Sequence, residues 1–296
     1  LNNEGCVEAD VTITRLSLEE FLIVTPADTI HRDINWIKNH IPDNANAIAI
    51  DVTSSEAVIT IMGPESRDFL QPIISNNLSN NSFPFASMQE VDIGYAKARA
   101  HRITYVGELG WELYVSNDLS NHVFETIMKR NTDHPIQLCG LHTMDSCRIE
   151  KGYRHFGHDI SNEDNALEAG LGFVIKEDKP SGKFAKMIGK DSIIKKRNAG
   201  YENLLLQFRL QDPEPLLYQN EPILRDGRIV GYLTSGNYGH HLKGAIGLGY
   251  VKCNSIGENI EDILSSSYQI DVAGNKINAD VSHKPMYDPK SLKIKI

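Results

Sequence analysis

The sequence is poor in cysteine, and its few cysteines form no recognisable pattern. Four occur among 296 residues, with no C-x-x-C pair and no regular spacing: Cys6, Cys139, Cys147 and Cys253. Such cysteines indicate neither a disulfide framework nor a zinc site. We therefore expect reduced thiols in an intracellular protein.

Long apolar runs and an excess of basic residues are also missing. No run approaches the roughly 18 apolar residues needed to cross a bilayer, and no charged-then-apolar signal segment opens the chain. The formal net charge of −9 disfavours general association with nucleic acid or anionic membrane, which are themselves negative. We expect neither partner, and a cytoplasmic location or, in a eukaryote, the mitochondrial matrix.

Dinucleotide and metal motifs fail on closer reading. The run GAIGLG at residues 244–249 lacks a following helix and a partner carboxylate, and there is no phosphate loop, so flavin or NAD should not bind by such a motif. His155, His158 and Asp159 supply metal-ligating atoms, but H-x-x-H without an intervening Glu and a distal ligand is weak. No metal site is expected.

Composition and length favour a soluble globular protein of about two domains. Hydrophobic residues make up 41% and charged residues 23%, which suits a chain with a real core. In the first part, periodicity predicts interleaved strands and helices: a strand at 7–14, a further strand starting within 17–23, a helix at 28–41 capped by Asp28, a strand at 58–62 leading into a helix to residue 70, and helices at 121–129 and 141–149.

The second part of the sequence has a different pattern, in which short β-type runs are separated by turn dipeptides. Asp226-Gly227 and Gly274-Asn275 each join two such runs as a tight hairpin. Closely spaced hairpins are typical of a small barrel or sandwich. The predicted fold class is α+β, with mixed sheets and helices in residues 1–183 and a small C-terminal β-barrel in residues 184–296.

The segment RITYVGELGWELYV, residues 102–115, reads as a hairpin with a glycine-containing loop. Side chains alternate along a strand, so Glu112 and Tyr114 should share one face, opposite Trp111 and Leu113. By itself this pattern allows Glu112 to be merely solvated.

Six segments resemble, in order, those of the glycine-cleavage T-protein (aminomethyltransferase) family, which binds tetrahydrofolate. They are GCVEADVTIT (5–14), IMGPESRDFL (61–70), the 102–115 segment, GLHTMDSCRIEKGYRHFGHDI (140–160), LEAGLGF (167–173) and TSGNYGHHLKGAIGLGYV (234–251). Three motifs are similar to the folate half of dimethylglycine and sarcosine dehydrogenases, in which a flavin domain comes first: E-K-G-Y-R-x-F-G-x-D (150–159), S-G-x-Y-G-H (235–240) and K-P-M-Y-D-P (284–289).

The resemblance implies roles for four residues. Asp10 matches a family aspartate near the one-carbon acceptor nitrogens of folate, and it would hold the amine and take up its proton. Glu112 matches the carboxylate that hydrogen-bonds the pterin ring. Tyr105 matches an aromatic residue beside the folate, although a core tyrosine is nearly as good a reading. Tyr238 either faces the folate cavity, with neighbouring His240, or simply packs.

Other polar residues carry weaker expectations. Glu108, in the turn, should be exposed, and Arg148 structural. Arg154 or Lys151 could meet the glutamate tail of folate, but solvated charge is the default reading. The T-protein arginine of this region aligns with Met144, so that folate contact does not carry over.

The resemblance therefore implies tetrahydrofolate-dependent one-carbon transfer, as the folate portion of a dimethylglycine or sarcosine dehydrogenase that forms 5,10-methylenetetrahydrofolate. The expected partners are folate, a methylamine-derived one-carbon donor and an upstream flavin domain that alone would hold FAD. Because residue 1 is Leu and falls inside a family strand, we expect a fragment lacking an N-terminal piece of the pocket. A free-standing T-protein served by a lipoylated carrier and a non-enzymatic folate-binding regulatory module are the alternatives.

Overall fold

The computed structural model describes residues 1–130, 135–175 and 186–296. These residues form two compact units, each built from separate stretches of chain. Unit 1 comprises Leu1–Thr12, Val24–Pro26 and Asp145–Pro289, and unit 2 comprises Ile13–Ile23, Ala27–Met144 and Lys290–Ile296. The domain boundary predicted between residues 183 and 184 lies outside the described residues and stays a prediction. No helix among the described residues is long and apolar enough to span a membrane.

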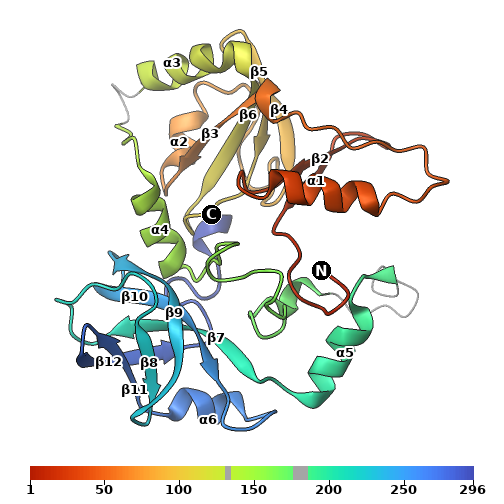
Figure 1. Cartoon of the computed structure of the whole chain (residues 1–296). Helices are drawn as coiled ribbons and strands as arrows, with labels where there is room; N and C mark the ends of the chain where they lie inside the picture. Colours follow the sequence, from red (N-terminus) through yellow and green to blue (C-terminus); the bar gives the residue numbers. More distant parts are fainter. Residues whose placement is uncertain (131–134, 176–185) are drawn as a thin grey trace. The chain divides into compact units, whose positions relative to one another are not determined.

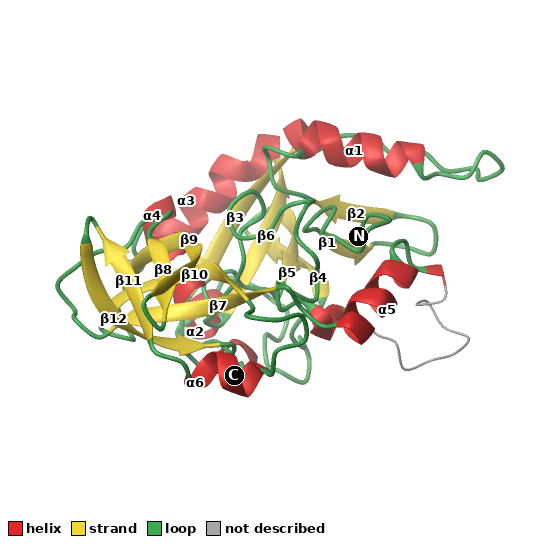
Figure 2. Ribbon diagram, turned by 60° about the horizontal axis from the view of Figure 1, so that its bottom comes forward, coloured by secondary structure: helices red, strands yellow, loops and turns green. Residues whose placement is uncertain are grey.

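Unit 2 is built on a four-stranded antiparallel sheet in the order β3-β6-β5-β4, which Figure 2 shows side by side. Its strands are β3 (Glu56–Met62), β4 (Met88–Ile93), β5 (Ala96–His101) and β6 (Gly110–Ser116). One face packs against α2 (Ser66–Leu70) and α3 (Ser120–Arg130) around the buried Trp111, Leu113 and Phe83. Val123 and Ile127, one turn apart on α3, are buried on the helix face that covers this core.

A smaller hairpin precedes this sheet. The strands β1 (Thr12–Arg15) and β2 (Phe21–Val24) pair with each other, and the helix α1 (Ile30–Asn39) follows. Helix α4 (Leu141–Glu150) leads out of the sheet region. Short 3₁₀ helices lie at Thr53–Ser55, Asn117–Leu119, Gly172–Val174 and Lys293–Lys295.

Unit 1 contains a closed six-stranded barrel in the order β10-β7-β12-β11-β8-β9 (Figure 1). This confirms the predicted C-terminal barrel. The strands are β7 (Asn203–Leu210), β8 (Pro222–Arg225), β9 (Arg228–Gly239), β10 (Gly244–Lys252), β11 (Tyr268–Val272) and β12 (Asn275–Ser282), with α5 (Lys190–Ala199) and α6 (Ile260–Ser265) beside them. Alternate strand residues, among them Leu206, Phe208 and Ile270, fill the barrel core.

Unit 1 also has a smaller core outside the barrel. Val7, Phe156 and Ile193 meet there, which ties the N-terminal segment and the loop after α4 to α5. Val7 donates its backbone N–H to the Asp164 carbonyl, at 3.0 Å. Residues 7–11 are therefore held by a loop and form no strand, and the predicted strand at 7–14 shrinks to Thr12–Arg15.

Two predicted turns are misplaced. The 102–115 segment is not itself a hairpin: β5 ends at His101, β6 begins at Gly110, and residues 102–109 form the connection. In the barrel, the β11–β12 turn consists of Ala273 and Gly274, both with positive φ, and Asn275 already pairs with Val272. The helix predicted at 28–41 starts after Thr29, not Asp28.

Candidate functional site

The polar face of the sheet in unit 2 holds the predicted folate carboxylate. Glu112 and Tyr114 lie on this face of β6, and the Tyr114 hydroxyl donates a 2.7 Å hydrogen bond to Glu112 Oε2. Trp111 and Leu113 are fully buried on the opposite face, as the alternation predicted. Glu112 itself is only partly buried, so its carboxylate remains within reach of a ligand.

His101 completes the group around this carboxylate. It lies directly opposite Glu112 in the β5–β6 register, and its ring centroid is 4.4 Å from that of Tyr114. Only 2% of its surface is exposed. Burial, and then the neighbouring Arg99, lower the pKa of His101, so the imidazole is held neutral. Neither His101 nor Tyr114 was predicted as a site residue from the sequence, although period-two alternation had placed Tyr114 on the same strand face as Glu112.

Tyr105 lies in the 102–109 connection and is partly exposed. The start of this connection is anchored, because the Arg102 guanidinium donates to the Phe83 carbonyl at 2.6 Å and to the Ile296 carbonyl at 3.0 Å. Gly107, with φ of 78°, takes the left-handed conformation that the connection requires. Glu108 is 8% exposed, which corrects the expectation that a turn glutamate would be solvated.

Asp10 lies in unit 1, in the extended segment that Val7 anchors. Its residue surface is exposed, yet surrounding protein removes enough water from the carboxyl to raise its pKa, and His155 opposes this rise. The pKa of His155 is in turn lowered, first by burial and then by His158 and Arg148. A carboxylate whose proton affinity is raised by the loss of surrounding water suits a proton acceptor.

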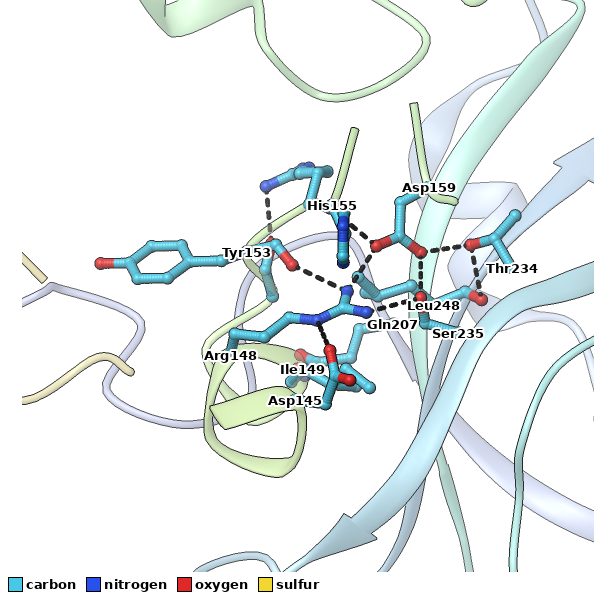
Figure 3. A network of polar contacts seen from close by, with 12 residues as sticks. Asp145, Arg148, Ile149, Tyr153, His155, Asp159, Gln207, Thr234, Ser235 and Leu248 are labelled. Carbon is cyan, nitrogen blue, oxygen red and sulfur yellow. Dashed lines mark hydrogen bonds and ion pairs between the residues drawn. The ribbon is translucent and has the colours of Figure 1, made fainter. Parts of the chain in front are cut away.

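The loop that presents His155 is fastened to the barrel by a buried ionic network (Figure 3). Asp159, with no exposed surface, forms an ion pair with Arg148 and accepts hydrogen bonds from Thr234 Oγ1 at 2.5 Å and Ser235 Oγ at 2.7 Å. It also accepts the His155 backbone N–H at 2.9 Å. The network confirms Arg148 as structural and gives Asp159 the same task.

Those hydrogen bonds leave Asp159 committed to neighbouring protein groups. Across the described ranges, no three His, Cys, Asp or Glu side chains are grouped so as to hold a metal ion. The rings of His155 and His158 pack 4.6 Å apart.

Two cations expected to be solvated are not. Lys151 has no exposed surface, and its ammonium forms an ion pair with Asp288 at 2.9 Å. Arg154 donates to the Ala169 carbonyl at 3.1 Å and to the Gly152 carbonyl at 2.8 Å. Both side chains hold loops of unit 1 together, which corrects the default reading.

Tyr238 lies near the end of β9 and is partly exposed, with its ring 5.2 Å from that of His240. Its backbone carbonyl accepts a 2.6 Å hydrogen bond from Ser146 Oγ on α4. A separate cavity of about 530 Å³ lies against the barrel, lined by residues that include His158, Thr234 and Tyr250. Among the described residues that line this cavity, none is one of the four predicted site residues.

The predicted site residues thus fall into two sets. Asp10 and Tyr238 belong to unit 1, whereas Glu112 and Tyr105 belong to unit 2. Within unit 2 the structure adds Tyr114 and His101 to Glu112, and within unit 1 it adds His155 to Asp10.

Comparison with known proteins identifies the class. The model of the GCVT N-terminal domain matches residues 1–179, and that of the glycine cleavage T-protein C-terminal barrel domain matches residues 204–288. The fold is that of the glycine cleavage system aminomethyltransferase T from Bartonella henselae, with a TM-score of 0.79 and 20% identity over 96% of this chain and 73% of that one.

Three curated relatives extend this result. The chain is 35% identical to 4-methylaminobutanoate oxidase (formaldehyde-forming) of Paenarthrobacter nicotinovorans, over all of this chain and 34% of the oxidase. It is 30% identical to human mitochondrial sarcosine dehydrogenase, over all of this chain and 33% of the dehydrogenase. It is 31% identical to an aminomethyltransferase of Halothermothrix orenii, over 87% of this chain and 70% of that protein.

The fold and both domain matches define an aminomethyltransferase-like protein. The chain belongs to the glycine-cleavage T-protein (aminomethyltransferase) family, a tetrahydrofolate-binding family, as the sequence motifs indicated. It spans about a third of the length of the oxidase and dehydrogenase relatives.

Proposed function

We propose that this chain binds tetrahydrofolate and carries out one-carbon transfer to it, as the folate portion of an enzyme of the dimethylglycine or sarcosine dehydrogenase type. The observation that carries the proposal is the position of Glu112 in a chain of this family. Its carboxylate is partly exposed on the polar face of the sheet, and the only hydrogen bond recorded for it within the described residues occupies Oε2. A carboxylate in this state suits the donor edge of a pterin.

Glu112 would accept hydrogen bonds from the pterin ring and so fix its orientation. Tyr105 is partly exposed on the anchored 102–109 connection that precedes β6, and it would pack against a ring of the folate. Tyr238, in unit 1, stays a predicted aromatic contact of folate. These roles are positioning roles, which suit a reaction whose reactive unit must be confined.

Asp10 would take up the proton that leaves the folate amine when the one-carbon unit is captured. Tetrahydrofolate, when bound, supplies the amine nitrogens that receive this unit. The raised pKa of Asp10 brings its proton affinity closer to that of a working general base. His155, whose pKa is lowered mainly by burial, would accept a hydrogen bond or relay the proton onwards.

The one-carbon unit would come from an upstream flavin domain, in which bound FAD would supply the oxidation of a methylamine. Support comes from two relatives whose names describe oxidation of N-methyl compounds and which are about three times as long as this chain. A free-standing aminomethyltransferase is the alternative, and it is favoured by the relative of which this chain covers 70%. Detection of bound flavin in the full-length gene product separates the two.

Calorimetric titration with 5-formyltetrahydrofolate tests the proposal. We expect micromolar binding that Glu112→Ala weakens by at least about tenfold, the effect of losing a charge-assisted hydrogen bond. Glu90→Ala is the matched control, because Glu90 is an exposed glutamate on β4 of the same sheet. Unchanged affinity in Glu112→Ala would remove the pterin assignment.

Asp10 needs a separate readout. Capture of formaldehyde by tetrahydrofolate, followed against the rate without protein, should lose its protein-dependent part in Asp10→Asn while folate binding persists. Asp43→Asn, which changes an exposed carboxylate, is the control. Full transfer by Asp10→Asn would sink the proton-acceptor role.

A further inference from the structure

Tyr114 is placed to control the carboxylate next to it. It is 5% exposed, whereas Glu112 is partly open, so a ligand can reach the carboxylate while the tyrosine lies behind it. Burial, and then the hydrogen bond to Glu112, raise the pKa of Tyr114 well above its ordinary value. The hydroxyl therefore keeps its proton and remains a donor to Glu112 Oε2 at 2.7 Å.

The neighbours of Tyr114 leave its ring little freedom. Tyr114, on β6, is paired with Val58 of β3 on one side and with Arg99 of β5 on the other. Arg99 itself forms an ion pair with Glu56. The ring of His101 lies 4.4 Å away at an interplanar angle of 32°. Side chains on one face of adjacent strands contact one another at such positions, so the hydroxyl is aimed by packing.

Within the described residues, the His101 ring shows no other role than its contact with Tyr114. Neither ring nitrogen has a hydrogen-bond partner there, although both are buried. Burying polar atoms without hydrogen-bond partners costs stability, so the buried imidazole of His101 calls for a physical explanation. Its contact with Tyr114 supplies one, because a flat ring at this distance keeps the tyrosine from turning away from Glu112.

We infer that Tyr114, supported by His101, is a positioning residue that presets the Glu112 carboxylate for its ligand. This inference rests on the proposed function and adds to it the means by which the carboxylate is oriented. Tyr114 acts through Glu112 and does not touch the ligand. With Oε2 engaged, Glu112 is held in one rotamer with Oε1 available, and a preset acceptor loses less conformational entropy on binding.

A double-mutant cycle tests this mode of action, with calorimetric titration of 5-formyltetrahydrofolate. We expect Tyr114→Phe to weaken binding by about fivefold to tenfold when Glu112 is present, the usual effect of one hydrogen bond. In a Glu112→Ala background, where no acceptor is left for the Tyr114 hydroxyl, the same change should cost less than about twofold, because the two residues act as one unit. Tyr250→Phe, which removes a buried hydroxyl from unit 1, should leave binding unchanged.

Three results would overturn the inference. Equal losses from Tyr114→Phe in both backgrounds would mean a purely structural role, which thermal melting of the variant would show directly. If Tyr114→Phe binds as the wild type while Glu112→Ala does not, the inference fails and the proposed function stands. Wild-type affinity in both Glu112→Ala and Glu112→Gln would remove the proposed function and the inference together.

Discussion

Asp159 forms an ion pair with Arg148, and both side chains are almost wholly buried, with 0% and 3% exposure. Removing one partner would leave the other charge buried without compensation. Thr234 and Ser235 add hydrogen bonds from β9, so the pair fastens the loop after α4 to the barrel.

We predict that Asp159→Ala lowers the free energy of unfolding by about 3–5 kcal/mol, the range for breaking a buried ion pair. Urea denaturation measures this. Arg209→Gln is the control, since Arg209 and Asp280 form a partly exposed pair at 3.3 Å in the same barrel and should contribute at most about 1 kcal/mol. Equal effects of the two variants would mean that burial does not set the contribution of the Arg148 pair.

Asp10 should make stability depend on pH. Because its pKa is raised in the folded state, the folded chain binds the proton more tightly, and the stability this adds is lost as pH rises above the ordinary aspartate value of about 3.9. Asp10→Asn should therefore be at least as stable as the wild type near neutral pH, with the difference vanishing in acid. Denaturation curves across the acidic range give the comparison, and a variant less stable at neutral pH contradicts it.

His101 should have the opposite dependence. Its pKa is lowered by burial, so protonation favours the unfolded chain, and stability is lost as pH falls below about 6.5, the ordinary histidine value. His101→Leu should reduce this loss on acidification. The exposed His31→Leu should leave it in place, and melting temperatures measured from neutral to mildly acidic pH distinguish the two.

Gly231 permits two barrel strands to approach. A Cβ at this position would lie 1.8 Å from the Tyr250 carbonyl oxygen on β10, and backbone cannot move aside cheaply. Gly231→Ala should destabilise the chain by more than about 2 kcal/mol. Gly140→Ala is the control, because a Cβ there meets no atom within 4 Å; comparable melting of the two variants would contradict the prediction.

The sequence predicted what depends on local periodicity. Alternation placed Glu112 and Tyr114 opposite Trp111 and Leu113 correctly, and the turn at Asp226-Gly227 joins β8 to β9 as expected. The α+β class and the barrel were also recovered. These features follow from residue spacing and from turn chemistry within a few residues.

Features that depend on distant partners were missed. Lys151 reads as solvated because nothing near it in the sequence reveals Asp288, which lies 137 residues further along the chain. The electrostatic influence of His155 on Asp10 likewise requires the fold. The β-branched run after His101 has strand propensity, but β5 ends at His101 and the next strand, β6, begins only at Gly110.

The last residues of the chain have a consequence for synthesis. Lys290–Ile296 belong to unit 2, where the guanidinium groups of Arg67 and Arg102 both donate to the Ile296 carbonyl. A ribosome therefore makes most of unit 2 before the barrel strands, and the 290–296 segment of unit 2 after them. The contacts of Arg67 and Arg102 with Ile296 have to wait for the barrel to be translated, so folding during synthesis cannot follow the order of the sequence alone.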